Sequence, residues 1–283
     1  MSRRATTLCA LALVLVAFGV LYRDVIVLLV HNWGGEDFSH GYLIVPVALY
    51  FAWDRRSRLA AAAPNPSIVG LIVVLASVGL LVASVLGAAV FLARLSMLGV
   101  VAGIVLYLYG WRHLKLLAFP IAFLVLMIPI PTILFNKITF PLQLVASRFG
   151  EAALTAVGIP VLREGNVITL SNMSLEVAEA CSGIRSLVSL LTFAIVLGYL
   201  ADRRIWTRTV IAVASVPVAI VANGIRVAAT GVAAYRFGPE AAEGVIHTFS
   251  GWLVFVVAVV LLGGLERVIV WLFPDRPEKG KAA

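Results

Sequence analysis

Three residues of different types in this chain are suited to acyl transfer. Cys181 ends a polar stretch just before the apolar run over residues 184–200. In a helix over that run, the thiol would lie near the N-terminus, where unpaired N–H groups and the helix dipole favour the nucleophilic thiolate. Arg226 could stabilise the thiolate or an oxyanion, and His247 could act as general base and acid. Together they would attack a peptide carbonyl to form a thioester.

Three further residues could support this chemistry. Asn223 precedes Arg226 by three positions, so the two share one face of a helix, and Asn223 could orient Arg226 or His247. The backbone N–H groups of Ser182 and Gly183 could help to hold the oxyanion.

Two alternatives use the same region of the sequence. Arg185 is a rival cation, because it lies one helical turn after Cys181 on the same face. Arg226 is favoured over it, because an arginine deep in an apolar run is costly and suggests a function. A zinc site could in principle draw on Cys181, His31, His40 and His247, although no ligand spacing supports it.

The composition is that of a membrane protein. Of 283 residues, 62% are hydrophobic and only 13% are charged, and the mean hydropathy is +1.05. Soluble domains have about 45–50% apolar and about 25% charged residues. The net charge of +8 is therefore assigned to loops, and no nucleic-acid partner is predicted. Cys9 and Cys181 form no paired motif, and we predict no cofactor and no metal.

The elements that must position these residues are predicted to be transmembrane helices. A span needs about 20 mostly apolar residues, which predicts an all-α polytopic protein with about eight spans. These cover residues 8–30, 42–53, 68–86, 90–109, 116–135, 184–200, 209–235 and 247–273.

Local signals refine these elements. Pro129 and Pro131 should kink or end the fifth span, and Arg94 should extend from the fourth span toward water. Before the sixth span we expect an outer-side interfacial helix over residues 137–158 and a short β-hairpin within residues 161–177.

Charge sets the orientation of the predicted spans. With eight spans, five basic segments share one side: the N-terminus, residues 54–58, 111–115 and 201–208, and the tail. The positive-inside rule makes that side cytoplasmic. Residues 31–41, 136–183 and 236–247 then face outward, which brings the thiol, guanidinium and imidazole to one depth. We predict one integral-membrane domain over residues 1–273 and a charged cytoplasmic tail over residues 274–283.

Several blocks of the sequence resemble the exosortase/archaeosortase family of multi-pass membrane cysteine transpeptidases. The resemblance covers nearly the whole chain. It rests on residues 179–187 (EACSGIRSL), residues 223–226 (NGIR) and His247, with support from residues 38–41 (FSHG), 141–144 (PLQL) and 163–168 (REGNVI).

The resemblance implies roles and a substrate class. Cys181 would be the nucleophile, Arg226 its essential cation and His247 the third member. The substrates would be membrane-anchored exported proteins with a C-terminal signal of short motif, hydrophobic helix and basic tail. In bacteria the motif is commonly Pro-Glu-Pro (PEP-CTERM), and the process is linked to exopolysaccharide. Archaeal relatives tend to carry arginine in place of His247, so the resemblance favours a bacterial exosortase of the inner membrane with a periplasmic active site.

We therefore predict a membrane cysteine protease and transpeptidase in contact with the bilayer. One alternative is a transporter or channel with Arg226 on the solute path. Another is a non-catalytic assembly partner in exopolysaccharide export. The cognate motif, the final acyl acceptor and the oligomeric state stay open.

Overall fold

The computed structural model describes residues 3–35, 38–171, 173–177, 183–201, 204–238 and 244–273, with the side chains of all of these except residues 3–8, 10–11 and 244–250. The chain divides into two compact units, Met1–Pro131 and Thr132–Ala283, and each is considered by itself. Within the described residues, five helices are long and apolar enough to cross a membrane, or seven if two interrupted pairs each count as one span. A largely helical multi-pass protein is therefore confirmed, but the count of eight spans is not. The single domain over residues 1–273 and the tail stay predictions.

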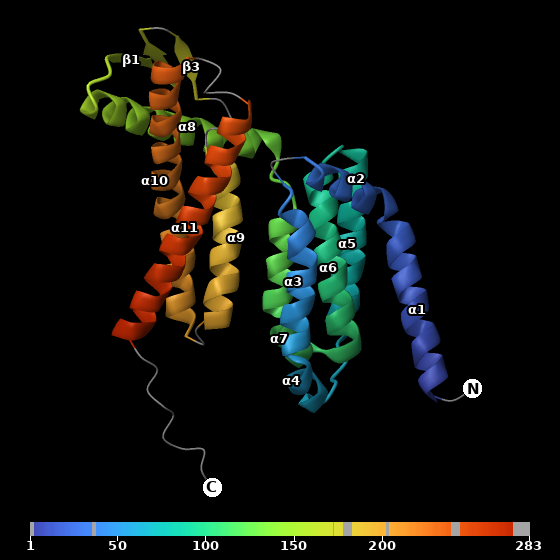
Figure 1. Cartoon of the computed structure of the whole chain (residues 1–283). Helices are drawn as coiled ribbons and strands as arrows, with labels where there is room; N and C mark the ends of the chain where they lie inside the picture. The colour runs from blue at the N-terminus through green and yellow to red at the C-terminus, as the bar shows by residue number, and fades with distance from the viewer. Residues whose placement is uncertain are drawn as a thin grey trace. The chain divides into compact units, whose positions relative to one another are not determined.

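In its described residues, the regular structure of the N-terminal unit is helical (Figure 1). Its elements are α1 (Arg3–Leu21), α2 (Arg23–Trp33), α3 (Gly41–Asp54), α4 (Arg56–Ala61), α5 (Ile68–Leu86), α6 (Val90–Tyr109), α7 (Trp111–Phe123) and the 3-10 helix η1 (Leu124–Met127). Helices α5 and α6 have the bounds that the hydropathy predicts. They pack closely because Gly70 lies against the backbone of Tyr107 and Gly103 lies against Val74, leaving no space for a side chain.

The first predicted span, over residues 8–30, is present only as two helices that meet at a bend. The helix breaks at Tyr22, whose backbone is not helical, and the flanking segments Ala12–Leu21 and Arg23–Trp33 meet at 68°. Tyr22 is fully buried, and its hydroxyl forms a 3.1 Å hydrogen bond with the Ser96 hydroxyl on α6. A buried phenol needs such a partner, so this contact fixes the chain at the bend.

The prediction that Arg94 extends toward water is wrong. Arg94 lies in the second turn of α6 and is 3% exposed. Its Nη2 lies 2.9 Å from the side-chain amide of Asn32 on α2, whose oxygen accepts the hydrogen bond. Burying a guanidinium is costly without polar partners, so this contact ties α2 to α6.

The predicted break at Pro129 and Pro131 is confirmed, but the fifth span does not continue to residue 135. Helix α7 passes into η1, which ends at Met127, and the next helix begins at Thr132. Proline lacks an N–H donor and disfavours helical backbone in the preceding residue, so two prolines in three residues end the helix. The helix predicted over residues 42–53 is present as α3, but its 14 residues are fewer than the about 20 that a span needs.

The C-terminal unit combines helices with a small sheet (Figure 1). Its elements are α8 (Thr132–Ala156), β1 (Val161–Glu164), β2 (Val167–Leu170), β3 (Ser174–Glu176), α9 (Ile184–Ala201), α10 (Ile205–Phe237) and α11 (Gly244–Leu272). The helix expected at residues 137–158 is present as α8 and begins earlier, at Thr132. The sixth span is confirmed with nearly unchanged bounds as α9.

The predicted β-hairpin is confirmed as β2 and β3, but a third strand accompanies it. The three strands form an antiparallel sheet in the order β1-β2-β3, and Glu164 pairs with Val167 across a two-residue turn. The turn residues are Gly165, which has a φ of +64°, and Asn166. A glycine at positive φ in a two-residue loop is typical of hairpin turns, so this pair was a readable signal for β1.

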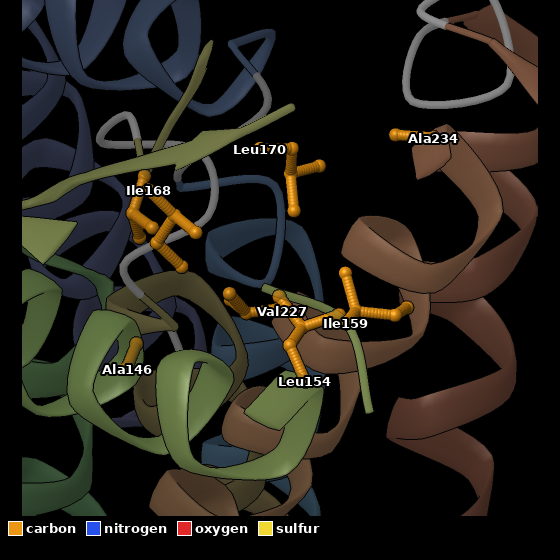
Figure 2. Close-up of a cluster of buried hydrophobic side chains, with 8 residues drawn as sticks. Ala146, Leu154, Ile159, Ile168, Leu170, Val227 and Ala234 are labelled. Atoms are coloured by element: carbon orange, nitrogen blue, oxygen red, sulfur yellow. The ribbon is translucent and has the colours of Figure 1, made fainter. Parts of the chain in front are cut away.

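Helix α10 takes part in two hydrophobic cores. At about 1.5 Å per residue, its 33 residues span about 50 Å, longer than the hydrocarbon layer of about 30 Å. One part packs with α9 and α11 in a bundle core of Leu190, Ala194, Ile211, Ala219, Ala222, Ala258, Leu262 and Ile269. The other part packs on α8 and the sheet in a sheet core of Ala146, Leu154, Ile159, Ile168, Leu170, Val177, Val227 and Ala234 (Figure 2).

Candidate active site

Asn223 and Arg226 lie on α10 where the bundle core gives way to the sheet core. Ala222 belongs to the bundle core and Val227 to the sheet core, so the two polar residues fall between the last contact of one and the first of the other. Gly224 faces α8, where a Cβ would lie 2.5 Å from Cγ of Phe149. Apolar packing on both sides therefore fixes this turn of α10.

Gly183, the residue just before α9, lies directly against Asn223. Gly183 is the N-cap of α9, because its carbonyl accepts the 2.8 Å hydrogen bond from the backbone N–H of Leu187. Its φ is +80°, and a Cβ built on it would lie 2.7 Å from Cγ of Asn223. Asn223 is 3% exposed. Only glycine fits here, since both the backbone conformation and the contact exclude a side chain.

The guanidinium of Arg226 lies against α11. A Cβ built on Gly251 would lie 3.1 Å from Cζ and 3.1 Å from Nη2 of Arg226. Gly251 follows His247 by one helical turn, and both positions have helical backbone in α11. Arg226 therefore joins α10 to the turn of α11 that comes directly after the predicted histidine.

The strand that leads toward residue 181 is held by Asn166. The backbone carbonyl of Asn166 accepts a 2.9 Å hydrogen bond from the N–H of Val177, and its Nδ2 donates to the Val177 carbonyl at 3.4 Å. Val177 is buried in the sheet core. The neighbouring turn is tied to α8, because Ser147 donates to the Gly165 carbonyl at 3.0 Å. The block at residues 163–168 thus anchors the chain on the strand side of the predicted cysteine.

The structure brings together some of the predicted site residues and leaves others outside what it describes. Gly183 lies against Asn223, and Arg226 follows Asn223 by three residues on α10. Arg185 lies half-buried in the first turn of α9. Cys181 and Ser182 lie outside the described residues. His247 has a described backbone but no described side chain, so the zinc alternative also stays untested.

The block at residues 38–41 packs in the N-terminal unit. Trp33 donates from Nε1 to the Met127 carbonyl at 2.9 Å, and Gly41 lies so close to the indole of Trp33 that no side chain fits. His40 contacts the backbone of Leu126 by a hydrogen bond. Burial lowers the pKa of His40, and that hydrogen bond opposes the shift. This block therefore fastens the loop after α2 onto η1.

An apolar groove between α10 and α11 was not anticipated from the sequence. Its volume is about 520 Å³, and it is lined by Pro217, Val218, Val221, Ala222, Ile225, Arg226, Ala229, Leu253, Val254, Val257 and Leu261. Arg226 is the only charged residue of this lining. The groove therefore opens beside the polar turn of α10.

These features define a multi-pass helical membrane protein with a polar site built on its longest described helix. The sequence model of the transmembrane exosortase family matches residues 32–264, which is most of the chain. This chain belongs to the transmembrane exosortase family. No curated protein and no solved structure matches it.

Proposed function

We propose that this exosortase is a membrane cysteine protease and transpeptidase. Its substrates would be exported proteins that end in a short motif, a hydrophobic helix and a basic tail. The observation that carries the proposal is the convergence of two glycines on one turn of α10. Gly183 lies on Asn223 and Gly251 lies on Arg226, three residues further along that helix. Each glycine is close in sequence to a residue that the proposed chemistry needs.

Covalent geometry limits how far those residues can be from this turn. Consecutive Cα atoms are about 3.8 Å apart, so the Cα of Cys181 lies within about 7.6 Å of the Cα of Gly183. His247 precedes Gly251 by four residues of helix, a rise of about 6 Å on the same face. These bounds support the proposal of a site that combines the thiol, the imidazole and the Arg226 guanidinium.

The proposed reaction proceeds by two acyl transfers. The Cys181 thiolate attacks the scissile carbonyl carbon, and a C–S bond forms while the carbonyl oxygen becomes an oxyanion. Arg226, with the backbone N–H groups of Ser182 and Gly183, stabilises that oxyanion. His247 protonates the leaving amine as the C–N bond breaks, which leaves a thioester.

In the second transfer, water or an amine attacks the thioester. His247 accepts the proton of the attacking group, and the C–S bond breaks to release the new acyl product. Asn223 acts as a positioning residue, since its side chain supports Gly183 and it shares a helix face with Arg226. The dipole at the start of α9 favours the thiolate that begins the cycle.

The proposed location is the bacterial inner membrane, with the site facing the periplasm. The basic segments at residues 54–58, 111–115 and 201–208 support this orientation through the positive-inside rule. The transporter and assembly-partner alternatives have no specific observation in their favour. The lining of the groove beside Arg226 is otherwise apolar, unlike a path for a polar solute.

The test is co-expression with a reporter protein that ends in Pro-Glu-Pro, an apolar helix and a basic tail. We expect the reporter to lose its tail with the native chain and with Cys9→Ala, which replaces the exposed cysteine of α1. Cys181→Ala should abolish the loss while its membrane level stays unchanged. The mass of the new C-terminus shows whether water or an amine resolved the thioester. Tail loss that persists in Cys181→Ala rules out the mechanism.

A further inference from the structure

The apolar groove between α10 and α11 has a shape and a lining that suit the binding of a third helix. We propose that it binds the hydrophobic helix of the substrate's C-terminal signal, an inference that rests on the proposed function. The groove is built within one unit, between two helices that pack side by side and are both apolar enough to span a membrane (Figure 1).

The groove is elongated along the helix axes. Its lining on α10 runs from Pro217 to Ala229, a rise of about 18 Å, and on α11 from Leu253 to Leu261, a rise of about 12 Å. This is about half of a hydrocarbon layer of about 30 Å. A chain segment that lies parallel to α10 and α11 fits such a slot better than a compact ligand does.

The spacing of the lining residues matches helix packing. On α10 the residues Val218, Ala222, Ile225 and Ala229 recur at intervals of four, three and four. Alternating intervals of three and four form the apolar seam onto which another helix packs at about 8–10 Å. Ala222 and Ala229 have small side chains, and small residues allow the backbones of two helices to approach closely in a membrane.

The wall on α11 has the same pattern. Val254, Val257 and Leu261 recur at intervals of three and four, and Val257 is 48% exposed. Both walls therefore present residues at helical spacing, into which the ridges of a third helix can pack.

The direction of the groove relates it to the site. Arg226 lies against Gly251, two residues before Leu253, so it lies near the end of the groove that is closest to Gly183 and Asn223. From there the groove follows α11 toward Leu261. A helix that begins at Arg226 and continues along the groove would leave the preceding residues beside the site. The order of motif and then helix in the substrate class fits this direction.

Disulfide crosslinking tests the occupant at short range. Both native cysteines are replaced (Cys9→Ala, Cys181→Ala), and Val257→Cys is paired with single cysteines along the reporter's apolar helix in native membranes. Val260→Cys is the matched control, because Val260 lies three residues further on α11 and is 66% exposed but does not line the groove. Val221→Cys on α10 is a second groove position in case Val257→Cys fails to insert.

We expect Val257→Cys to crosslink at reporter positions spaced three or four residues apart, because a disulfide forms only where Cα atoms come within about 7 Å. Val260→Cys should give about tenfold less product, since its Cβ points out of the groove. Equal yields at the two positions, crosslinks only between two copies of the enzyme, or no crosslink at either groove position would overturn the proposal.

A variant that fills the groove with a larger side chain, and that keeps both native cysteines, tests the proposal independently through KM. Val257→Trp should raise KM for the reporter about tenfold or more relative to Val260→Trp, because overpacking the groove costs on the order of 1–3 kcal/mol. Equal KM values for the two variants would contradict the proposal. These outcomes distinguish a failure of the groove proposal from a failure of the proposed function. Cys181-dependent cleavage without groove crosslinks refutes only the groove proposal, and groove crosslinks without cleavage by the native chain refute only the protease.

Discussion

Replacing Gly183 by alanine should disrupt the site far more than the same change at a matched glycine. Gly183 and Gly158 have almost the same positive φ, +80° and +81°. An L-residue in this region costs roughly 1–2 kcal/mol, so both variants should lose that much stability. A Cβ at Gly158 has nothing within 4 Å, whereas at Gly183 it would lie 2.7 Å from Cγ and 2.8 Å from Cβ of Asn223.

The added contact sets the size of the effect. Carbon atoms pack at about 3.5–4.0 Å, so Asn223 and the start of α9 must separate by roughly 1 Å in Gly183→Ala. A displacement of about 1 Å at a reacting centre lowers the rate about 100-fold. We therefore expect Gly183→Ala to process the reporter about 100-fold more slowly, while Gly158→Ala keeps nearly the native rate.

The assay is the initial rate of tail loss by purified protein, normalised to folded protein from thermal unfolding. The comparison isolates the contact, because the two variants share the backbone cost. Equal rates in Gly183→Ala and Gly158→Ala would refute the conclusion that the contact between Gly183 and Asn223 positions the site.

Two further predictions concern the Arg226 contact and the loop at His40. Gly251→Val should displace the Arg226 guanidinium and lower the processing rate about 100-fold. Gly263→Val is the control, because a Cβ at Gly263 has no atom within 4 Å and this variant should carry only the cost of valine in α11 that both variants share. Similar processing rates in the two variants would contradict this prediction. Burial lowers the pKa of His40 below the unfolded value of about 6.5, so its contribution to stability is present above that pH and lost as pH falls through the lower folded value. Thermal unfolding between pH 8 and 5 should show a smaller loss of stability in His40→Gln, and an unchanged loss would exclude His40 as its source.

The sequence predicts helices well where apolar residues run without interruption. Helices α5 and α6 and the start of α9 have the expected bounds, because about 20 apolar residues in a row have few alternatives to a membrane helix. The bend in the first span was not predicted, because it involves a contact between residues far apart in the sequence. At the bend, the Tyr22 hydroxyl is hydrogen-bonded to the Ser96 hydroxyl, 74 residues away. No local pattern contains that contact.

The candidate site also has parts that the sequence predicts and parts that it does not. Asn223 and Arg226 stand out because polar groups are costly in an apolar run, and that cost is visible in the sequence. The contacts of Gly183 and Gly251 are between helices, so the sequence gives no indication of them. The groove was missed for a different reason, since its three-and-four spacing is also the pattern of an ordinary packed helix face.

The most direct test of the proposed site is the rate at which iodoacetamide alkylates Cys181 at pH 6.5 in a Cys9→Ala background. If Arg226 holds the thiolate, Arg226→Met should lower that rate about tenfold or more, because a neighbouring cation favours the charged form by that order. Arg185→Met should leave the rate close to that of the parent. An unchanged rate in Arg226→Met, or a fall only in Arg185→Met, would contradict a site built around Cys181 and Arg226.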